Sequence, residues 1–406
     1  MQLIELNETE YKEFTSNNNA HFLESYEWGE LSKKRGYTPY YIGLKDNSII
    51  KCSALLLKKD LPLGYSYFYI PRGYTIDFKD YKLLEEFTKR IKEFAKPHKA
   101  IFFRMDPAIK LHTINELAEK IDGDNNYELV DFLEKIGFKH RKLTKFFETT
   151  QPRYTFRMDL TKNIDEIIMS YSKTARNNIK RADSYGVTVK VGEREDISEF
   201  VRLMKMTEKR QNFYSHTESF YYDFYDVFSK NNHLKLLLAE LDFKNIVEVI
   251  DSKIEEVSKK KKIDTDHLNK LKKEKEFFLE KLKIKEKAIV SAYIMVYYGN
   301  KSWYLYGAND MEYKDAFSNY KIFDYQVKMA KENRIEIFDL FGTIGDPKAD
   351  TNLIGIHDFK KKWGGEYTEF IGEFDFVLNK LMYFAFTKLI PIWHRLVNKK
   401  LRKKGE

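Results

Sequence analysis

The sequence contains a single cysteine among its 406 residues, Cys52. A disulfide within the chain is therefore excluded, which favours a reducing compartment. Cys52 lies in the apolar run SIIKCSALLL, which predicts a strand, so we expect a buried structural thiol. No run approaches the ~18 consecutive apolar residues of a membrane-spanning helix. The first residues, MQLIELNETEYKEF, lack the basic and apolar regions of an export signal. We therefore expect a cytoplasmic protein.

Familiar catalytic signatures are absent as well. The sequence shows no cluster of cysteine and histidine with metal-ligand spacing, no glycine-lysine phosphate loop and no nucleophile-elbow serine. These absences argue against metal catalysis and against covalent catalysis by serine or cysteine.

Apolar and charged residues are both plentiful. Hydrophobic residues make up 43% of the chain and aromatic residues 16%, which is enough for packed cores and argues against disorder. A chain of this length exceeds one ordinary compact core and favours two or more domains. The formal net charge of +9 indicates an anionic partner, which could be nucleic acid, anionic lipid or a phosphate-bearing substrate.

Helical and extended patterns alternate in both halves of the chain. In the first half, TPYYIGL, SIIKCSALLL and YSYFYIP predict successive strands, and LLEEFTKRIKEFAKPHK predicts an amphipathic helix. The second half repeats this plan, with one helix predicted through IDEIIMSYSKTARNNIKRADSYG and strands at KAIVSAYIMVYY and IEIFDLFG. We predict two α/β (α+β) domains, residues 1–153 and residues 154–243 with 288–376.

The interruption between these two parts of the second domain, residues 244–287, predicts a helical arm. It contains 14 lysines and 10 acidic residues, with no glycine or proline. Apolar residues recur at three-and-four spacing in two sets: Phe243, Ile246, Ile250 and Val257, then Leu268, Leu271, Phe278 and Leu282. The polar stretch KKKKIDTDH between the sets predicts a reversal of the chain, and hence an antiparallel coiled-coil hairpin. The alternative is a solvated insertion without a role.

The C-terminal segment, residues 377–406, is basic and amphipathic. It carries eight Lys or Arg residues and one acidic residue among apolar and aromatic side chains. A helix of this composition can lie in the interface of an anionic membrane. Packing on the body of the protein, with a solvated tail, is the other interpretation.

Basic and aromatic residues in both halves are candidates for anion binding. Lys33 and Lys34 end a predicted helix before Gly36, where cations are favourable, although without other information an exposed charge cluster is the favoured explanation. Arg210 and Tyr214 are four residues apart and share a helical face if the helix continues that far. Arginine can hold a phosphate with two hydrogen bonds and tyrosine can add a third, unless these residues only pack at a helix end.

Two further stretches could line a ligand site. Tyr304 and Tyr306 are two residues apart on a predicted strand, so we expect them to share one face. The glycine-rich stretch after Asp339, DLFGTIGD, could leave room for a ligand and turn its backbone N–H groups towards an anion. A lysine of FKKKWGG just beyond it could donate to a developing oxyanion, as acyl transfer requires. Solvated surface charge is the alternative for these three lysines.

These stretches, taken in order, resemble the FemABX family of peptidyltransferases, which use aminoacyl-tRNA to build the interpeptide bridge of peptidoglycan. The resemblance covers about residues 1–375. It is carried by SYEWGELSKKRGY, FFRMDP, YSKTARNNIKRADSYGVTV, EKRQNFYSH, WYLYGA, IEIFDLFGTIGD and DFKKKWGGEYTEFIGEFD. It implies two tandem domains of acetyltransferase-like (GNAT-type) fold, with a helical arm inserted in the second.

The resemblance also implies site residues. The family's phosphate-contacting lysine matches Lys34, with Lys33 as the alternative, and its arginine and tyrosine match Arg210 and Tyr214. The tyrosine of the central strand matches Tyr306, with Tyr304 as the alternative.

The family's lysine that stabilises the tetrahedral intermediate follows a phenylalanine, a pair that matches Phe359 and Lys360. Lys361 and Lys362 are then left as solvated charge or tRNA contacts. Asp339 or Asp358 could be the general base, and proton removal through substrate or water is the alternative.

The activity implied is transfer of an amino acid from aminoacyl-tRNA to an amine on a stem peptide or growing bridge. The acceptor would be a peptidoglycan precursor, lipid II or UDP-MurNAc-pentapeptide, and the site could contact the inner face of a membrane. The ester is already activated, so we expect no cofactor, with aminoacyl-tRNA as co-substrate. Two alternatives remain: an acetyl-CoA-dependent N-acetyltransferase, whose usual pyrophosphate loop is not evident, and a non-catalytic tRNA- or protein-binding module.

Overall fold

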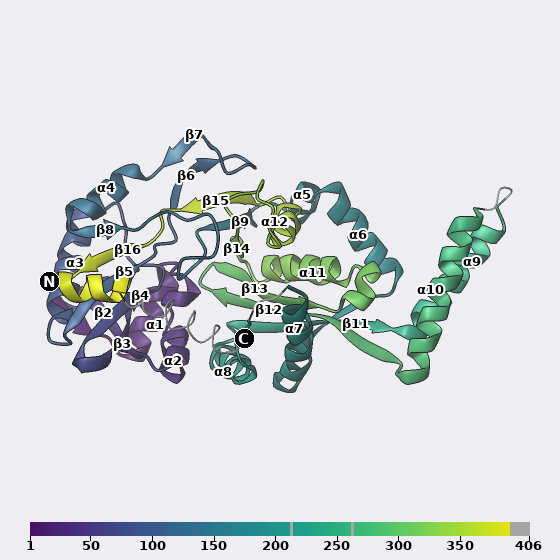
Figure 1. Ribbon diagram of the computed structural model, residues 1–406, viewed down its shortest axis with the longest axis horizontal. Helices are drawn as coiled ribbons and strands as arrows, with labels where there is room; N and C mark the ends of the chain where they lie inside the picture. Colours follow the sequence, from purple (N-terminus) through teal and green to yellow (C-terminus); the bar gives the residue numbers. More distant parts are fainter. Residues whose placement is uncertain (212–213, 261–263, 390–406) are drawn as a thin grey trace, which may run out of the picture. The chain divides into compact units, whose positions relative to one another are not determined.

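The computed structural model describes residues 1–211, 214–260 and 264–389. The chain forms two compact units (Figure 1). Unit 1 contains Met1–Thr155, Gly342–Ala349 and the described residues from Tyr367, and unit 2 contains Phe156–Phe341 and Asp350–Glu366.

Unit 1 is built on a mixed sheet of seven strands. Their order across the sheet is β1 (Gln2–Glu5), β2 (Thr38–Asp46), β3 (Ile49–Asp60), β4 (Ser66–Ile70), β5 (Ala100–Met105), β16 (Phe374–Val377) and β8 (Phe138–His140). Neighbouring strands are antiparallel except β4 and β5, which are parallel and are connected through helix α3 (Tyr81–Ala95).

The core of unit 1 lies where α3 covers the sheet. Asp80 caps the helix by accepting a hydrogen bond from the Leu83 N–H, and Leu84, Phe87 and Ile91 are buried at three-and-four spacing. The cysteine expectation is confirmed, because Cys52 is fully buried in this core and burial raises the pKa of its thiol.

The other elements of unit 1 surround this sheet. They are α1 (Glu8–Asn17), α2 (Tyr26–Lys34), β6 (Lys110–Ile114), β7 (Lys120–Asn125), α4 (Tyr127–Lys135), β15 (Glu366–Phe370) and α13 (Lys380–Phe384). Strand β6 pairs antiparallel with β7 and, through Thr113 and Thr368, with β15.

Unit 2 repeats the strand plan of unit 1. Its strands run in the order β10 (Thr188–Gly192), β11 (Leu234–Asp242), β12 (Lys287–Tyr298), β13 (Lys301–Asn309), β14 (Ile337–Thr343) and β9 (Tyr154–Asp159). The first four are antiparallel neighbours, and β13 and β14 are parallel and connected through α11 (Ser318–Glu332). The predicted pair of similar α/β units is therefore confirmed.

Two helices separate the first and second strands of each plan, α1 and α2 in unit 1 and α7 (Ile197–Gln211) and α8 (Glu218–Phe228) in unit 2. The single helix predicted over residues 164–186 is wrong, because the chain forms α5 (Ile164–Ser170) and α6 (Lys173–Ser184). Tyr171 is extended, and the Ser172 hydroxyl accepts from the Ala175 N–H and starts a new helix.

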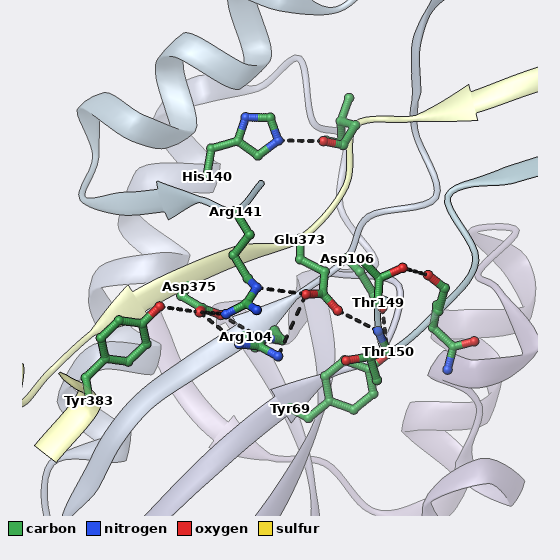
Figure 2. A network of polar contacts seen from close by, with 12 residues as sticks. Tyr69, Arg104, Asp106, His140, Arg141, Thr149, Thr150, Glu373, Asp375 and Tyr383 are labelled. Carbon is green, nitrogen blue, oxygen red and sulfur yellow. Dashed lines mark hydrogen bonds and ion pairs between the residues drawn. The ribbon is translucent and has the colours of Figure 1, made fainter. Parts of the chain in front are cut away.

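The compact units do not follow the predicted domain boundaries at their C-terminal side. Residues 342–349 and 367–376, expected in the second domain, lie in unit 1. The reason is strand β16, which pairs with both β5 and β8. Arg104 on β5 donates two hydrogen bonds to Asp375 on β16, at 2.7 and 2.9 Å (Figure 2). Arg104 and Asp375 are 271 residues apart in sequence, so local sequence patterns do not predict that β5 and β16 pair.

The predicted helical hairpin is confirmed in unit 2. It consists of α9 (Phe243–Ser258) and α10 (Thr265–Ile284), which run beside one another at the right of Figure 1. Both helices have aspartate N-caps, Asp242 and Asp264, and Asp251 pairs with Lys275 across the hairpin at 2.6 Å. The buried residues include most of the predicted seam: Phe243, Ile246, Ile250, Val257, Leu271 and Phe278.

The C-terminal segment is described as far as Leu389. Helix α13 continues into a π-helical turn, Ala385–Leu389. Residues 390–406 of the predicted amphipathic segment lie outside the described residues. Within the described ranges, no helix combines the length and the apolar character needed to cross a membrane.

Candidate functional site

Lys360 is a buried lysine in unit 2. It lies near the end of α12 (Ile354–Lys361) and its residue surface is only 6% exposed. Lysine is rarely buried to this extent without compensation. The ammonium donates a hydrogen bond to the carbonyl of Phe341 at 3.3 Å and lies 5.5 Å from the centre of the Tyr304 ring. Burial lowers the pKa of Lys360 to about 7, although the charge of Asp339 acts to raise it.

A tight turn at the end of β14 presents the carbonyl that Lys360 contacts. Phe341 has a positive φ of 57°, which is uncommon for a residue with a side chain and costs roughly 1 kcal/mol. The Asp339 carboxylate accepts from the Phe341 N–H at 2.8 Å and thereby closes the turn. Arg157 of β9 lies 3.6 Å from the other carboxylate oxygen. Asp339 thus contributes both to the local backbone geometry and to the electrostatic environment of Lys360.

Aromatic side chains hold α12 in place. Trp363 is fully buried, with ring centres 4.0 Å from Phe323 and 5.7 Å from Phe359. Phe359 is half-buried and also packs edge-on against Tyr320. Because Phe359 belongs to this aromatic cluster, a structural role accompanies the predicted substrate contact.

The three consecutive lysines have different environments. Lys361 is exposed, and the Lys362 ammonium lies 3.3 Å from the Tyr320 hydroxyl at an intermediate exposure. Lys360 is the buried member of the three. Its buried position is the property that separates it chemically from its neighbours.

The expectation that Tyr304 and Tyr306 share one face is wrong. Strand β13 contains a bulge, so Tyr304 pairs with Met295 while Tyr306 pairs with the adjacent residue Ile294. Adjacent residues of a strand face opposite ways, so the bulge sends the two tyrosines to opposite faces. Tyr304 lies beside Lys360, and burial raises its pKa to about 12.

Tyr306 instead belongs to an aromatic cluster on the other face. Its ring lies 5.6 Å from Tyr221 and 5.8 Å from His216, in edge-on geometry. The structure therefore brings the alternative residue, Tyr304, to Lys360 and places the preferred one, Tyr306, elsewhere.

Arg210 and Tyr214 do not share a helical face as expected. Helix α7 ends at Gln211, so helical spacing does not extend to Tyr214. Arg210 donates to the carbonyl of Asn309 at 3.5 Å, and the Tyr214 side chain is fully exposed. Nearby, Glu208 accepts a hydrogen bond from the Ser215 N–H, which lowers the pKa of Glu208. Both predicted anion-binding groups remain accessible at this surface.

Lys34 is the last residue of α2 in unit 1 and is exposed. Its neighbour Lys33 forms an ion pair with Glu30 at 2.6 Å. Both lysines are exposed at this helix end, and the choice of Lys34 stays a proposal.

The candidate general bases have different surroundings. Asp339 is buried, with 6% exposure, and its charge acts on Lys360. Asp358 is exposed on α12. Asp339 is therefore the acid that belongs to the lysine site.

The glycines of this region serve backbone packing. Gly364 has a φ of 74°, and a Cβ there would lie 2.6 Å from the Ser170 carbonyl. A Cβ at Gly342 would meet Pro152, and one at Gly345 would meet Tyr154, within unit 1. The loop of FGTIGD is therefore filled by neighbouring side chains, against the expectation that its glycines leave room for a ligand.

Sequence reasoning did not single out a buried acid in unit 1, Asp106. It follows β5 directly and accepts a hydrogen bond from the Tyr69 hydroxyl at 2.8 Å (Figure 2). It accepts a second hydrogen bond from the Arg72 N–H at 2.7 Å. Burial raises the pKa of Asp106 to about 6, although Arg72 acts to lower it. Its one signal in sequence was its place at the end of the strand FFRM.

Comparison with known proteins identifies the family of the chain. The model of the FemAB family matches residues 6–390. The lipid II:glycine glycyltransferase of Staphylococcus epidermidis is 28% identical over 407 residues, with 95% of this chain and 94% of that protein covered. The protein of the same name from Staphylococcus aureus is 28% identical over 428 residues, covering 99% and 98%. The crystal structure of FemX superposes with a TM-score of 0.80 at 27% identity, covering 94% of this chain and 99% of that one. The chain belongs to the FemAB family.

Proposed function

We propose that this protein transfers an amino acid from aminoacyl-tRNA to an amine of a peptidoglycan precursor and so forms the interpeptide bridge. Membership of the FemAB family supports this activity, as do relatives named lipid II:glycine glycyltransferase. The observation that carries the mechanism is the buried Lys360, with its pKa lowered to about 7. The protein is an aminoacyltransferase, and its acceptor is lipid II or a UDP-linked precursor.

The proposed reaction is a direct aminolysis of the tRNA ester. The neutral acceptor amine attacks the ester carbonyl and forms the new C–N bond, and negative charge develops on the carbonyl oxygen. The Lys360 ammonium donates a hydrogen bond to this oxyanion. The C–O bond to the tRNA ribose then breaks, and the 3′ oxygen takes up the proton that the amine loses. One C–N bond forms as one ester C–O bond breaks, so the reaction needs neither ATP nor a metal.

The site residues have assigned tasks in this proposal. Lys34, Arg210 and Tyr214 bind phosphate groups of the substrates. Phe359 contacts substrate, and Tyr304, which lies beside the lysine, takes the role near the reacting carbonyl that was expected for Tyr306. Exposed lysines and arginines bind the tRNA backbone, so affinity should fall as salt rises.

The pH dependence of transfer follows from the lysine. The pKa of Lys360 is lowered to about 7, so the ammonium form is lost as the pH rises through neutrality. The acceptor amine reacts only when it is neutral, which favours higher pH. Opposite requirements of this kind give a bell-shaped profile, whose alkaline limb belongs to Lys360.

The test is a transfer assay with purified protein. Labelled aminoacyl-tRNAs with several different amino acids are each combined with lipid II or with UDP-MurNAc-pentapeptide. We expect Lys360→Met to lower transfer by about a hundredfold or more, the effect of removing one oxyanion donor. Lys361→Met is the matched control, because Lys361 is exposed and should retain activity.

Methionine suits this test because it is close to lysine in volume and suits a buried site. Unchanged far-UV circular dichroism verifies the fold of the variant. Full activity of Lys360→Met would remove the proposed role of the lysine. Absence of transfer by the wild-type chain with every donor and acceptor pair would contradict the proposed reaction itself.

A further inference from the structure

A patch of outward-facing apolar side chains lies on unit 1. It consists of Leu63, Leu381 and Phe384, which are 86%, 76% and 54% exposed. Leu63 and Leu381 have the highest exposures of any large apolar side chain in the described part of unit 1. Single exposed leucines are ordinary on protein surfaces, but several on one patch indicate a partner.

One apolar cluster supports the two segments that carry these residues, the turn of Leu63 and the helix of Leu381 and Phe384, although the segments are more than 300 residues apart in sequence. Its buried members are Ile101, Phe102 and Tyr383, and Leu61, Tyr65, Met382 and Phe386 pack against them. Leu63 lies in the turn between Leu61 and Tyr65. Leu381 and Phe384 lie on α13, the yellow helix at the left of Figure 1, beside Met382. The turn Pro62–Gly64 and helix α13 are therefore anchored by the same apolar cluster.

The exposed Leu63 has a left-handed backbone conformation, which is unfavourable for leucine. Leu63 has a φ of 63° inside the turn Pro62–Gly64. A left-handed conformation is unfavourable for leucine, and glycine would adopt it without cost. The turn therefore combines a strained backbone with a fully presented apolar side chain.

Hydrogen bonding and aromatic packing hold the inner side of α13 on unit 1. The Tyr383 hydroxyl donates to buried Asp375 at 2.7 Å, and Asp375 is also held by Arg104 (Figure 2). Tyr67 stacks with Phe102 at 5.3 Å, and Phe386 packs against both rings at 5.6 Å. The inner face of this helix is thus committed to unit 1, while Leu381 and Phe384 are left on its outer face.

The charge around the patch is positive. Lys380 and Lys388 are exposed at the two ends of the described C-terminal helical segment, and residues 377–389 contain no acidic residue. The Lys139 ammonium lies 5.8 Å from the Tyr383 ring. The nearest acid along the turn, Asp60, is paired with Lys58 at 3.1 Å.

We infer that this patch docks on the surface of an anionic lipid bilayer. Leucine and phenylalanine enter the boundary between head groups and acyl chains, and lysines at the margin bind the anionic head groups. Tyr65 and Tyr67, which are partly exposed beside the patch, have the amphipathic rings that favour the membrane interface. The inference does not depend on the proposed transfer reaction.

The test measures binding of the full chain to vesicles that contain neither precursor nor tRNA. Vesicles of phosphatidylglycerol and phosphatidylcholine in equal parts are compared with vesicles of phosphatidylcholine alone, by sedimentation. We expect binding to the anionic vesicles and a loss of about tenfold or more for Leu63→Ser/Leu381→Ser/Phe384→Ser. Ile49→Ser is the matched control, because Ile49 is 62% exposed in unit 1 but is not part of the cluster.

The basic margin is tested separately. Lys380→Gln/Lys388→Gln should weaken binding to anionic vesicles by roughly fivefold for each lysine and reduce the dependence on salt. An unchanged melting temperature of every variant shows that the fold is intact, as expected for exposed positions.

Three outcomes would overturn the inference. The wild-type chain could fail to bind anionic vesicles, or the triple apolar variant could bind as tightly as the wild type. The third is a wild-type dimer in sedimentation velocity that the triple variant dissociates, since the occupant would then be a second copy of the chain. None of these results bears on transfer to the soluble acceptor UDP-MurNAc-pentapeptide, which is measured without vesicles.

Discussion

The two units share a strand plan but stabilise buried charge in opposite ways. In unit 1, burial acts to raise the pKa of Asp375, yet the hydrogen bonds and charge of Arg104, together with Tyr383 and Arg141, outweigh it and the pKa is lowered. In unit 2, burial lowers the pKa of Lys360 to about 7, and the attraction of Asp339 does not compensate. The charged form is therefore favoured in one unit and disfavoured in the other. A buried charge with full pairing is a structural part of a fold, whereas one with incomplete compensation is available for chemistry.

The largest effect should come from removing the buried lysine charge. The pKa of Lys360 is about 7 in the fold against an ordinary value of 10.5, so between these pH values the unfolded chain binds more protons. Stability of the wild type should therefore rise with pH across this window, by up to about 5 kcal/mol from this group. Lys360→Met should lack this contribution and be the more stable protein at neutral pH. Denaturant unfolding of both proteins from neutral to alkaline pH measures the difference. If the difference in stability between Lys360→Met and the wild type did not change with pH, the contrast drawn between Lys360 and Asp375 would be wrong.

Removing a paired charge of unit 1 should have the opposite effect on stability and make the protein less stable. Arg104→Met should destabilise the protein by about 3 to 5 kcal/mol, because it leaves the buried carboxylate of Asp375 without its main partner. The depressed pKa of Asp375 means that its contribution is present above the unfolded value near ~4 and is lost as the pH falls below it. The free energy of unfolding at neutral and acidic pH checks both statements. Arg90→Met, which removes a partly exposed arginine from α3, is the control. Equal stability of the Arg104 and Arg90 variants would contradict the prediction.

A smaller change should follow from altering the partner of the lysine. Asp339→Asn keeps an oxygen that can accept from the Phe341 N–H but removes the charge that raises the pKa of Lys360. The pKa should fall further, and the alkaline limb of the transfer profile should move down by about one pH unit, with roughly tenfold slower transfer above neutrality. The pH profile of transfer measures the shift. Asp358→Asn, at an exposed position on the same helix, should leave the profile where it is. If both variants moved it equally, a specific role of Asp339 would be lost.

The smallest effect is expected at an exposed ion pair. Lys33→Met removes the contact with Glu30 at 2.6 Å, in which Lys33 is exposed and Glu30 is partly exposed. Such pairs contribute less than about 0.5 kcal/mol on a helix. Thermal unfolding of the variant against the wild type tests this expectation. A loss as large as that for Arg104→Met would show that burial does not explain the contrast between the pairs.

Several features could be predicted because they depend on residues close in sequence. The hairpin arm follows from apolar residues at three-and-four spacing in Phe243–Ser258 and Thr265–Ile284, and each helix has its own aspartate cap. The buried Cys52 follows from an apolar run of strand length. Local spacing was misleading where one residue changed the local geometry. Ser172 starts a second helix where one was expected, and the bulge in β13 separates Tyr304 from Tyr306.

The sequence by itself determined the repeated α/β plan, the helical arm and the basic charge, because these follow from periodicity and composition. The proposal of Lys360 among three lysines rests on the order of the motifs that resemble the family. Only the tertiary structure decided that β16 pairs with β5, that Tyr304 lies beside Lys360, and that Phe341 presents its carbonyl to the lysine. The physical reason is distance along the chain. Burial and charge compensation arise from groups that are far apart in sequence, and their balance sets the pKa on which the chemistry of Lys360 depends.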